Sequence, residues 1–278
     1  MKVKTIKFLT MFAVALSLFA VGCSGDDNSP DPGDSGPDAT CTDNIRNGDE
    51  EGVDCGGSCS ASCETSGEGT DLDGSLSEDR TLDATETYSL IGTLSVESGV
   101  TLTIPAGTRI VSQTGTDKYI VVQQGGKIDI QGTAANPVIM TSSGESPGDW
   151  GGLVIAGNAT TSEGTGVVAE VGGIIYGGTD DADDSGSISY LIINYAGAQI
   201  NSESQYNGLT LYSVGSGTSI DNVAILNGTD DGVEFFGGTV SASNFYLENN
   251  EDDAVDWTEG WNGTLQNTYV LHTIDGFS

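Results

Sequence analysis

The stretch Ser219–Gly260 decides the fold. It reads as two lines of equal length, SIDNVAILNGTDDGVEFFGG at Ser219–Gly238 and SASNFYLENNEDDAVDWTEG at Ser241–Gly260. The second line follows the first at an offset of 22 residues without a gap, and it aligns Asn227 with Asn249, Asp230 and Asp231 with Asp252 and Asp253, Val233 with Val255, Glu234 with Asp256, and Phe235 with Trp257. A constant period in the low twenties predicts a solenoid, in which each coil buries its apolar face against its neighbours.

Alternation within the period indicates which kind of solenoid to expect. Val223, Ile225 and Val233 belong to runs that are apolar at every second position, which is the period of a strand. Gly, Asn and Asp separate these runs and supply turns. We therefore predict an all-β chain whose main domain is a right-handed parallel β-helix, with an amide ladder where Asn227 lies above Asn249. The alternative is that the two lines are similar by chance and form strands of a β-sandwich.

Strand parity also assigns the aromatic residues. Phe235 and Trp257 share the parity of Val233 and Val255, so we expect them to stack inside the solenoid. Phe236 has the opposite parity, and Trp261 follows the last strand of the repeat. Exposed aromatic rings can bind sugars, so Phe236 and Trp261 are the candidate ligand-binding residues.

Acidic residues recur in register on the same two lines. Carboxylates from adjacent coils are ligands that Ca²⁺ accepts, so the sequence predicts a calcium site formed by Asp230, Asp231, Glu234, Asp252, Asp253 and Asp256. Two other interpretations stay open. In the first, these residues form solvated turns, as the pairs Asp180-Asp181 and Asp183-Asp184 would. In the second, two of the carboxylates cleave a glycosidic bond by acid/base catalysis. The sequence after Lys127 contains no Lys or Arg and a single His, which disfavours the enzymatic interpretation.

The first residues predict export and a lipid anchor. Lys2, Lys4 and Lys7 precede an apolar stretch that is short for a membrane span, and the stretch ends in Ala20-Val21-Gly22-Cys23. Small residues before a cysteine resemble the lipobox at which bacterial lipoproteins are cleaved. We therefore expect residues 1–22 to be a lipoprotein signal peptide, Cys23 to be acylated, and the protein to be anchored in the outer membrane, at the cell surface of a Gram-negative bacterium. An ordinary secretory signal with a chance cysteine is the alternative.

Composition divides the remainder of the chain. Residues 23–40 are rich in Pro, Gly, Ser and Asp and predict a disordered acidic tether, and residues 64–81 predict a second linker. Between them, residues 41–63 form a Cys-rich module, and its four cysteines predict two disulfides of open connectivity: Cys41, Cys55, Cys59 and Cys63. A zinc site is the alternative. The β-helix is expected over residues 82–278 with an incomplete last coil, and with loops projecting from one edge at Thr160–Gly166, Asp180–Gly186 and Gln199–Tyr206.

Several runs carry a resemblance to known families. The residues from Cys41 to Gly57 are similar to a small Cys-rich module of exported bacterial proteins. The later region resembles a family of β-helix lipoproteins from Bacteroidetes and marine bacteria, through TLTIPAGT, GDWGGLVIAGNA, YGGTDDADDSGSISYLIINYAG, VGSGTSIDNV, DDGVEFFGGTV and DDAVDWTEGWNG. This resemblance implies the β-helix and the surface location, and it implies no particular reaction.

The charge of the chain restricts its partners. The formal net charge is −33, which repels nucleic acids and anionic glycans and attracts divalent cations. We therefore predict a surface lipoprotein whose β-helix is a binding, adhesion or structural module, stabilised by Ca²⁺ and facing a glycan or a surface protein. The alternative is a glycan-processing enzyme, a hydrolase or lyase with a pectin-lyase-like fold.

Overall fold

The computed structural model describes Ser58 and residues 69–202 and 204–273, and within these ranges every regular element is a strand. In this part of the chain no helix is long and apolar enough to cross a membrane. The strands are β1 (Asp71–Leu76), β2 (Arg80–Thr81), β3 (Thr87–Val96), β4 (Thr101–Pro105), β5 (Arg109–Ser112), β6 (Ile120–Val122), β7 (Lys127–Gln131), β8 (Val138–Ser142), β9 (Leu153–Ala156), β10 (Val167–Val168), β11 (Ile175–Tyr176), β12 (Gly186–Asn194), β13 (Gln199–Asn201), β14 (Ser204–Gln205), β15 (Leu209–Tyr212), β16 (Ser219–Leu226), β17 (Val233–Phe236), β18 (Ser241–Glu248), β19 (Val255–Thr258) and β20 (Leu265–Leu271).

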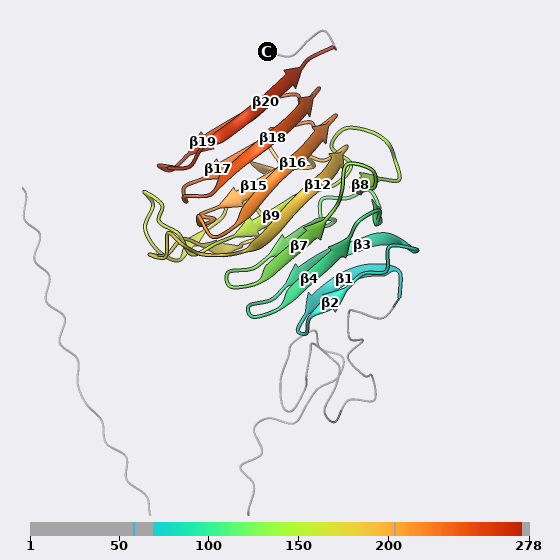
Figure 1. The fold of residues 1–278 in the computed structure, drawn as a ribbon, viewed down its shortest axis with the longest axis horizontal. Coiled ribbons are helices and arrows are strands. Elements are labelled where there is room, and N and C mark those ends of the chain that lie inside the picture. The colour runs from blue at the N-terminus through green and yellow to red at the C-terminus, as the bar shows by residue number, and fades with distance from the viewer. Residues whose placement is uncertain (1–57, 59–68, 203, 274–278) are drawn as a thin grey trace, which may run out of the picture. The chain divides into compact units, whose positions relative to one another are not determined.

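The strands form the predicted parallel β-helix. Sixteen of them belong to one sheet, whose main path runs β19-β17-β15-β9-β6-β3-β5-β8-β12-β16-β18-β20, with parallel pairing throughout. The exceptions are two small antiparallel hairpins, β10–β11 and β13–β14. Figure 1 shows the strands stacked from β1 and β2 at one end to β19 and β20 at the other. Strands β1 and β2 lie inside the predicted linker 64–81, so the stack begins before Leu82.

Strand pairing reproduces the 22-residue repeat where the coils are regular. Ser219 of β16 pairs with Ser241 of β18, and Val233 of β17 pairs with Val255 of β19. One coil earlier the spacing is longer, because Leu209 of β15 pairs with Val233. The alignment of the two quoted lines is therefore the hydrogen-bonded register, and earlier coils depart from it by the length of their loops.

A left-handed residue bends the longer strands. Asn222 in β16 and Asn244 in β18 have positive φ values of 57° and 60°, and neither takes part in the strand register. Burial alternates up to this residue and then shifts by one position, so that Ile220 and Val223 both face the interior. A single residue in this conformation therefore turns the strand from one face of the coil to the next.

The two asparagines of the predicted amide ladder lie at a second corner, where the side-chain amide of each donates to a different partner. Asn227 and Asn249 both adopt left-handed backbone conformations. Asn227 Nδ2 donates to Asn194 Oδ1 at 3.0 Å, and Asn249 Nδ2 donates to Thr273 Oγ1 at 3.0 Å. The two asparagines thus occupy equivalent positions, and each is joined to another coil through these contacts.

Apolar side chains fill the inside of the coils and also cover part of the outside. In β9 and β15 all four residues are buried, whereas a free sheet face would leave every second one exposed. The outward residues Val154 and Tyr212 pack against Ala169 and Tyr176 from Thr160–Gly178, here called the covering segment. The predicted loops Thr160–Gly166 and Gln199–Tyr206 are themselves largely exposed, and the chain covers this face at Ala169–Tyr176, at Ala198 and at Tyr206.

Candidate metal centre

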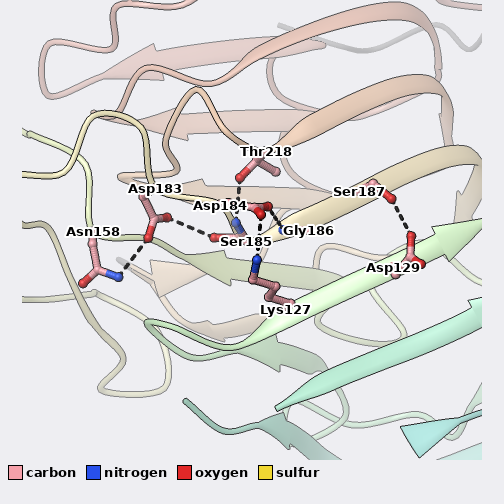
Figure 2. Close-up of polar contacts among 9 residues, drawn as sticks. All are labelled: Lys127, Asp129, Asn158, Asp183, Asp184, Ser185, Gly186, Ser187 and Thr218. Atoms are coloured by element: carbon pink, nitrogen blue, oxygen red, sulfur yellow. Dashed lines mark hydrogen bonds and ion pairs between the residues drawn. The ribbon is translucent and has the colours of Figure 1, made fainter. Parts of the chain in front are cut away.

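The acidic residues before β12 are satisfied by donors from the protein itself. Asp183 accepts hydrogen bonds from Asn158 Nδ2 at 3.0 Å and from Ser185 Oγ at 3.2 Å (Figure 2). Asp184 accepts from Lys127 Nζ at 2.6 Å, and this hydrogen bond is the main cause that lowers the pKa of Asp184. For these carboxylates the interpretation as structural turn residues is the one the contacts support.

The acidic residues aligned by the repeat gather on the outer face of the last coils. Glu234 in β17 pairs in register with Asp256 in β19, and carboxylate oxygens of Asp231, Glu234 and Asp256 all lie within 4.8 Å of one another. A second group, Asp230, Asp231 and Asp252, meets the same limit and shares Asp231. We call these five residues the acidic cluster.

The sixth predicted ligand, Asp253, lies outside both groups. Its side chain is exposed, and its backbone N–H donates to Asp231 Oδ1 at 2.9 Å. Asp253 therefore contacts the cluster through its main chain, and its carboxylate lies outside both groups. The adjacent coils thus join at this point by a backbone-to-carboxylate bond.

Burial makes ionisation of the cluster costly. It raises the pKa of Glu234 to about 9, with further increases from the charges of Asp231, Asp256 and Glu170. It raises the pKa of Asp231 to about 7, where Asp230 also contributes. A carboxylate in such a place either keeps a proton or needs a cation, because removing a charge from water without compensation is unfavourable.

Asn207 belongs to this site, although sequence reasoning missed it. Its Nδ2 donates to Glu234 Oε2 at 2.7 Å, its side chain is 2 % exposed, and its Oδ1 has no hydrogen-bond partner. The two end atoms of a carboxamide share one carbon, so this unpartnered oxygen lies beside the Glu234 carboxylate. The signal was an alignment at the longer spacing, which places Asn207-Gly208-Leu209 against Asp231-Gly232-Val233.

The donor set of the site is made of oxygen atoms. Carboxylates and an amide carbonyl are the ligands that Ca²⁺ and Mg²⁺ take, and no sulfur or imidazole ligand is among the cluster residues. A cation among Asp231, Glu234 and Asp256 would compensate several buried charges at once. Ca²⁺ fits such a set well, because it accepts about six to eight oxygens in irregular geometry.

Of the two predicted sugar platforms, Phe236 is buried and Trp261 is partly buried against the core. Phe236 is 9 % exposed and stacks on Tyr212, with ring centroids 4.4 Å apart beneath the covering segment. Trp261 stacks on Phe235 at 4.2 Å, and its Nε1 donates to the Val240 carbonyl at 3.0 Å. Strand parity could not predict the surroundings of these two rings. The covering segment lies over the outer face that carries Phe236, and the turn after β19 folds Trp261 over the interior of the coil.

The predicted interior pair of Phe235 and Trp257 is also corrected. The two residues are in register, as predicted, and Phe235 is fully buried. Trp257 is 61 % exposed, because β19 is the last strand on its side of the described stack. Trp261 therefore takes the place over Phe235 that the repeat had assigned to Trp257.

The cysteine sites lie outside the described residues. This applies to the predicted acylated residue, Cys23, and to the predicted disulfide cysteines Cys41, Cys55, Cys59 and Cys63. The structure therefore bears only on the coils and on the residues that they bring together.

Comparison with known families agrees with the pairing of the strands. The family model described as a pectate-lyase-like β-helix domain matches residues 74–277. The chain belongs to this family. Neither a curated protein nor a solved structure matches the chain. In this pectate-lyase-like β-helix, the acidic cluster occupies the outer face of β17 and β19 and the turns before these strands.

Proposed function

We propose that this chain is a lipid-anchored protein of the outer membrane whose β-helix is a binding or adhesion module held together by Ca²⁺. The observation that carries the cation is the acidic cluster with the unpartnered Oδ1 of Asn207 beside it. In the described part of the chain, the side chains of Lys118 and Lys127 already pair with Asp117 and Asp184. Since no Lys or Arg follows Lys127, a metal ion is the counter-charge best suited to the later coils.

Ca²⁺ is expected to stabilise the protein, and Asp231→Asn should abolish that gain. Asp231 belongs to both carboxylate groups, so its replacement weakens each of them. A ligand present at about 100 times its Kd adds roughly 2.7 kcal/mol to the free energy of unfolding. Thermal unfolding in EDTA, in millimolar CaCl₂ and in NaCl of matched ionic strength measures the gain, and calorimetric titration with CaCl₂ measures binding.

Glu78→Gln is the matched control for this experiment. It removes one negative charge from an exposed residue in the first coil and should leave the Ca²⁺ gain intact. Equal midpoint shifts in CaCl₂ and in matched NaCl would instead mean that salt merely screens the acidic surface. In that case the cluster is a solvated turn and the proposed cation site is wrong.

The partner is proposed to be a glycan or another surface protein. Phe236 is buried and Trp261 partly buried, whereas Trp257, Tyr246 and Tyr269 are the exposed aromatic residues in the described part of the later coils. Tyr246 and Tyr269 stack on adjacent strands with ring centroids 5.7 Å apart. They replace Phe236 and Trp261 as the aromatic groups available for contact.

The lipid anchor is supported by the sequence that ends at Cys23. Cys23→Ala should give unprocessed precursor or released protein, because the acylated residue is lost. Incorporation of labelled palmitate into the wild-type protein and the variant, followed by fractionation of membranes, measures the change. Undiminished labelling of Cys23→Ala would place the lipid elsewhere or remove it from the proposal.

A glycan-processing enzyme is the second candidate. Glu234, with its raised pKa, lies beside Asp231 and Asp256 and has the protonated form that a general acid requires. The carboxylate oxygens of these three residues lie within 4.8 Å of one another, which is closer than the roughly 6.5–9.5 Å between the carboxyl groups of inverting hydrolases and nearer to the roughly 5–5.5 Å of retaining ones. Release of reducing sugar from a glycan panel, lost in Glu234→Gln, would favour this candidate over a binding module.

A further inference from the structure

Four asparagines of the chain are followed directly by glycine. They are Asn47, Asn207, Asn227 and Asn262. In an Asn-Gly dipeptide the backbone nitrogen of glycine can attack the side-chain carbonyl carbon of asparagine, because glycine has no side chain that hinders the approach. The attack requires an asparagine side chain that can turn and a glycine nitrogen that no hydrogen bond holds. Asn47 lies outside the described residues, and the structure distinguishes the other three.

The dipeptide that begins at Asn207 is protected by burial and by hydrogen bonds. Gly208 N donates to the Asp231 carbonyl at 2.9 Å. The Asn207 side chain is buried, and its Nδ2 donates to Glu234 Oε2 at 2.7 Å. The coil must therefore open locally before the glycine nitrogen can react.

The dipeptide that begins at Asn227 is protected in the same way. Gly228 N donates to Asn250 Oδ1 at 3.2 Å. The side-chain amide of Asn227 donates to Asn194 Oδ1 at 3.0 Å, which fixes its direction at the corner of the coil. Both reacting groups are thus held by neighbouring coils.

Asn262 is placed differently. It lies in the irregular stretch between β19 and β20, and it is exposed. Within the described part of the chain, neither its side chain nor Gly263 N makes a hydrogen bond. Here the attacking nitrogen and the attacked side chain are both unrestrained by hydrogen bonds.

The packing of this turn requires glycine at position 263. A Cβ atom on Gly263 would lie 1.8 Å from the Val240 carbonyl oxygen, a distance that no Cβ atom tolerates. The same oxygen accepts a hydrogen bond from Trp261 Nε1 at 3.0 Å. The close packing that places Trp261 over Phe235 thus leaves no room for a side chain at position 263 that would shield the backbone nitrogen.

We propose that Asn262 is a site of spontaneous deamidation, and that its conversion to isoaspartate loosens Trp261 from the interior of the coil. Gly263 N bonds to Asn262 Cγ and closes a succinimide ring. The bond from Cγ to Nδ2 breaks, and the side-chain nitrogen leaves as ammonia with the proton that Gly263 N loses. Water then opens the ring at one of its two carbonyl carbons, which gives aspartate or isoaspartate. This reaction is independent of the proposed cation site.

Isoaspartate places one additional methylene group in the backbone of the turn. On one side of this group, Asn262 N donates to the Gly238 carbonyl at 2.9 Å. On the other side, Thr264 N donates to Ser241 Oγ at 3.1 Å. Because the turn is held on both sides, the additional length displaces the residues between these contacts and their neighbour Trp261. Conversion should therefore weaken the stacking of Trp261 over the interior.

Incubation of the full chain at pH 8.5 and 37 °C, followed by peptide mapping with mass spectrometry, tests the site. Asn262 should lose its amide about tenfold or more faster than Asn207 and Asn227, whose following glycine nitrogens are hydrogen-bonded. Methylation by a protein-isoaspartate methyltransferase measures isoaspartate, and Asn262→Gln should remove this signal from the peptide, because the larger ring forms far more slowly. Loss at similar rates from all three asparagines, or no loss from Asn262, overturns the proposed site.

Urea unfolding of the same samples tests the effect on the interior. The incubated wild-type protein should show a second population with a lower urea midpoint, in proportion to its isoaspartate content. Incubated Asn262→Gln should keep its midpoint. Freshly prepared Asn262→Asp carries the new charge without the additional methylene group and should unfold at the wild-type midpoint. An unchanged midpoint in protein that contains isoaspartate, or an equal decrease in fresh Asn262→Asp, overturns the link to Trp261.

Discussion

Phe235→Ala is expected to lower the free energy of unfolding by about 3–5 kcal/mol, the usual range for replacing a buried phenylalanine by alanine. Phe235 is fully buried, and Trp261 lies over it with ring centroids 4.2 Å apart. The substitution leaves a cavity inside the coil and removes the stacking partner of Trp261. Urea unfolding followed by circular dichroism measures the loss.

Trp257→Ala provides the contrast, because it occupies the equivalent position in the next repeat. Its side chain is 61 % exposed, so the loss should stay below about 1 kcal/mol. A loss at Trp257 equal to that at Phe235 would show that the ring of Trp257 is also packed in solution. The assignment of Trp261 to the interior would then be incorrect.

The second large effect is an unusual dependence of stability on pH. In EDTA the protein should become more stable as pH falls from 8.5 to 5.5, because Glu234 and Asp231 have pKa values of about 9 and about 7 when folded. Over this range the folded protein holds protons that the unfolded chain releases, so stability is lost as pH rises through these values. The slope reaches about 1.4 kcal/mol per pH unit for each group, which gives a total of a few kcal/mol.

Urea midpoints measured from pH 5.5 to 8.5 check this expectation. The double variant Asp231→Asn with Glu234→Gln should lose the decline above pH 6 and be the more stable protein at pH 8.5 in EDTA. Asp73→Asn with Glu78→Gln removes the same charge from exposed positions in the first coil and should keep the wild-type slope. An identical slope in both double variants would assign the effect to the overall net charge. Saturating CaCl₂ should flatten the wild-type decline, since the cation replaces the protons.

The repeat predicted the coil and its register, and it predicted which carboxylates meet. Glu234 faces Asp256 because a period of 22 residues places them on adjacent strands with the same parity. Asn207 escaped this reasoning because its coil pairs at a longer spacing, which is set by the longer turn between β15 and β16. Alignment gives the position of Asp253 in the coil, but it leaves open whether the side chain or the backbone of this residue makes the contact, and the contact seen is made by the backbone.

The 22-residue repeat could not predict the burial of the outer face, for a different reason. Phe236 has outward parity, and on an uncovered sheet it would be exposed. The covering segment that buries it is separated from it by more than fifty residues and has no counterpart in the two quoted lines. A periodic pattern describes contacts between coils, whereas contacts made by an insertion depend on where the inserted chain folds back.

The left-handed asparagines at the strand bends also favour the correct register between stacked coils. Asn222, Asn244 and Asn267 all have φ values between 57° and 60°. If the coil of β16 slipped by a single residue against its neighbour, Val223 would enter a conformation that a β-branched side chain strongly disfavours, although the unbranched Tyr190 adopts it at the equivalent position of β12 with a φ of 48°. Misaligned stacks are thus penalised by the backbone itself, in addition to the exposure of apolar side chains. The left-handed corner therefore disfavours misaligned assembly of the coils, and it places no constraint on the length of the loops between them.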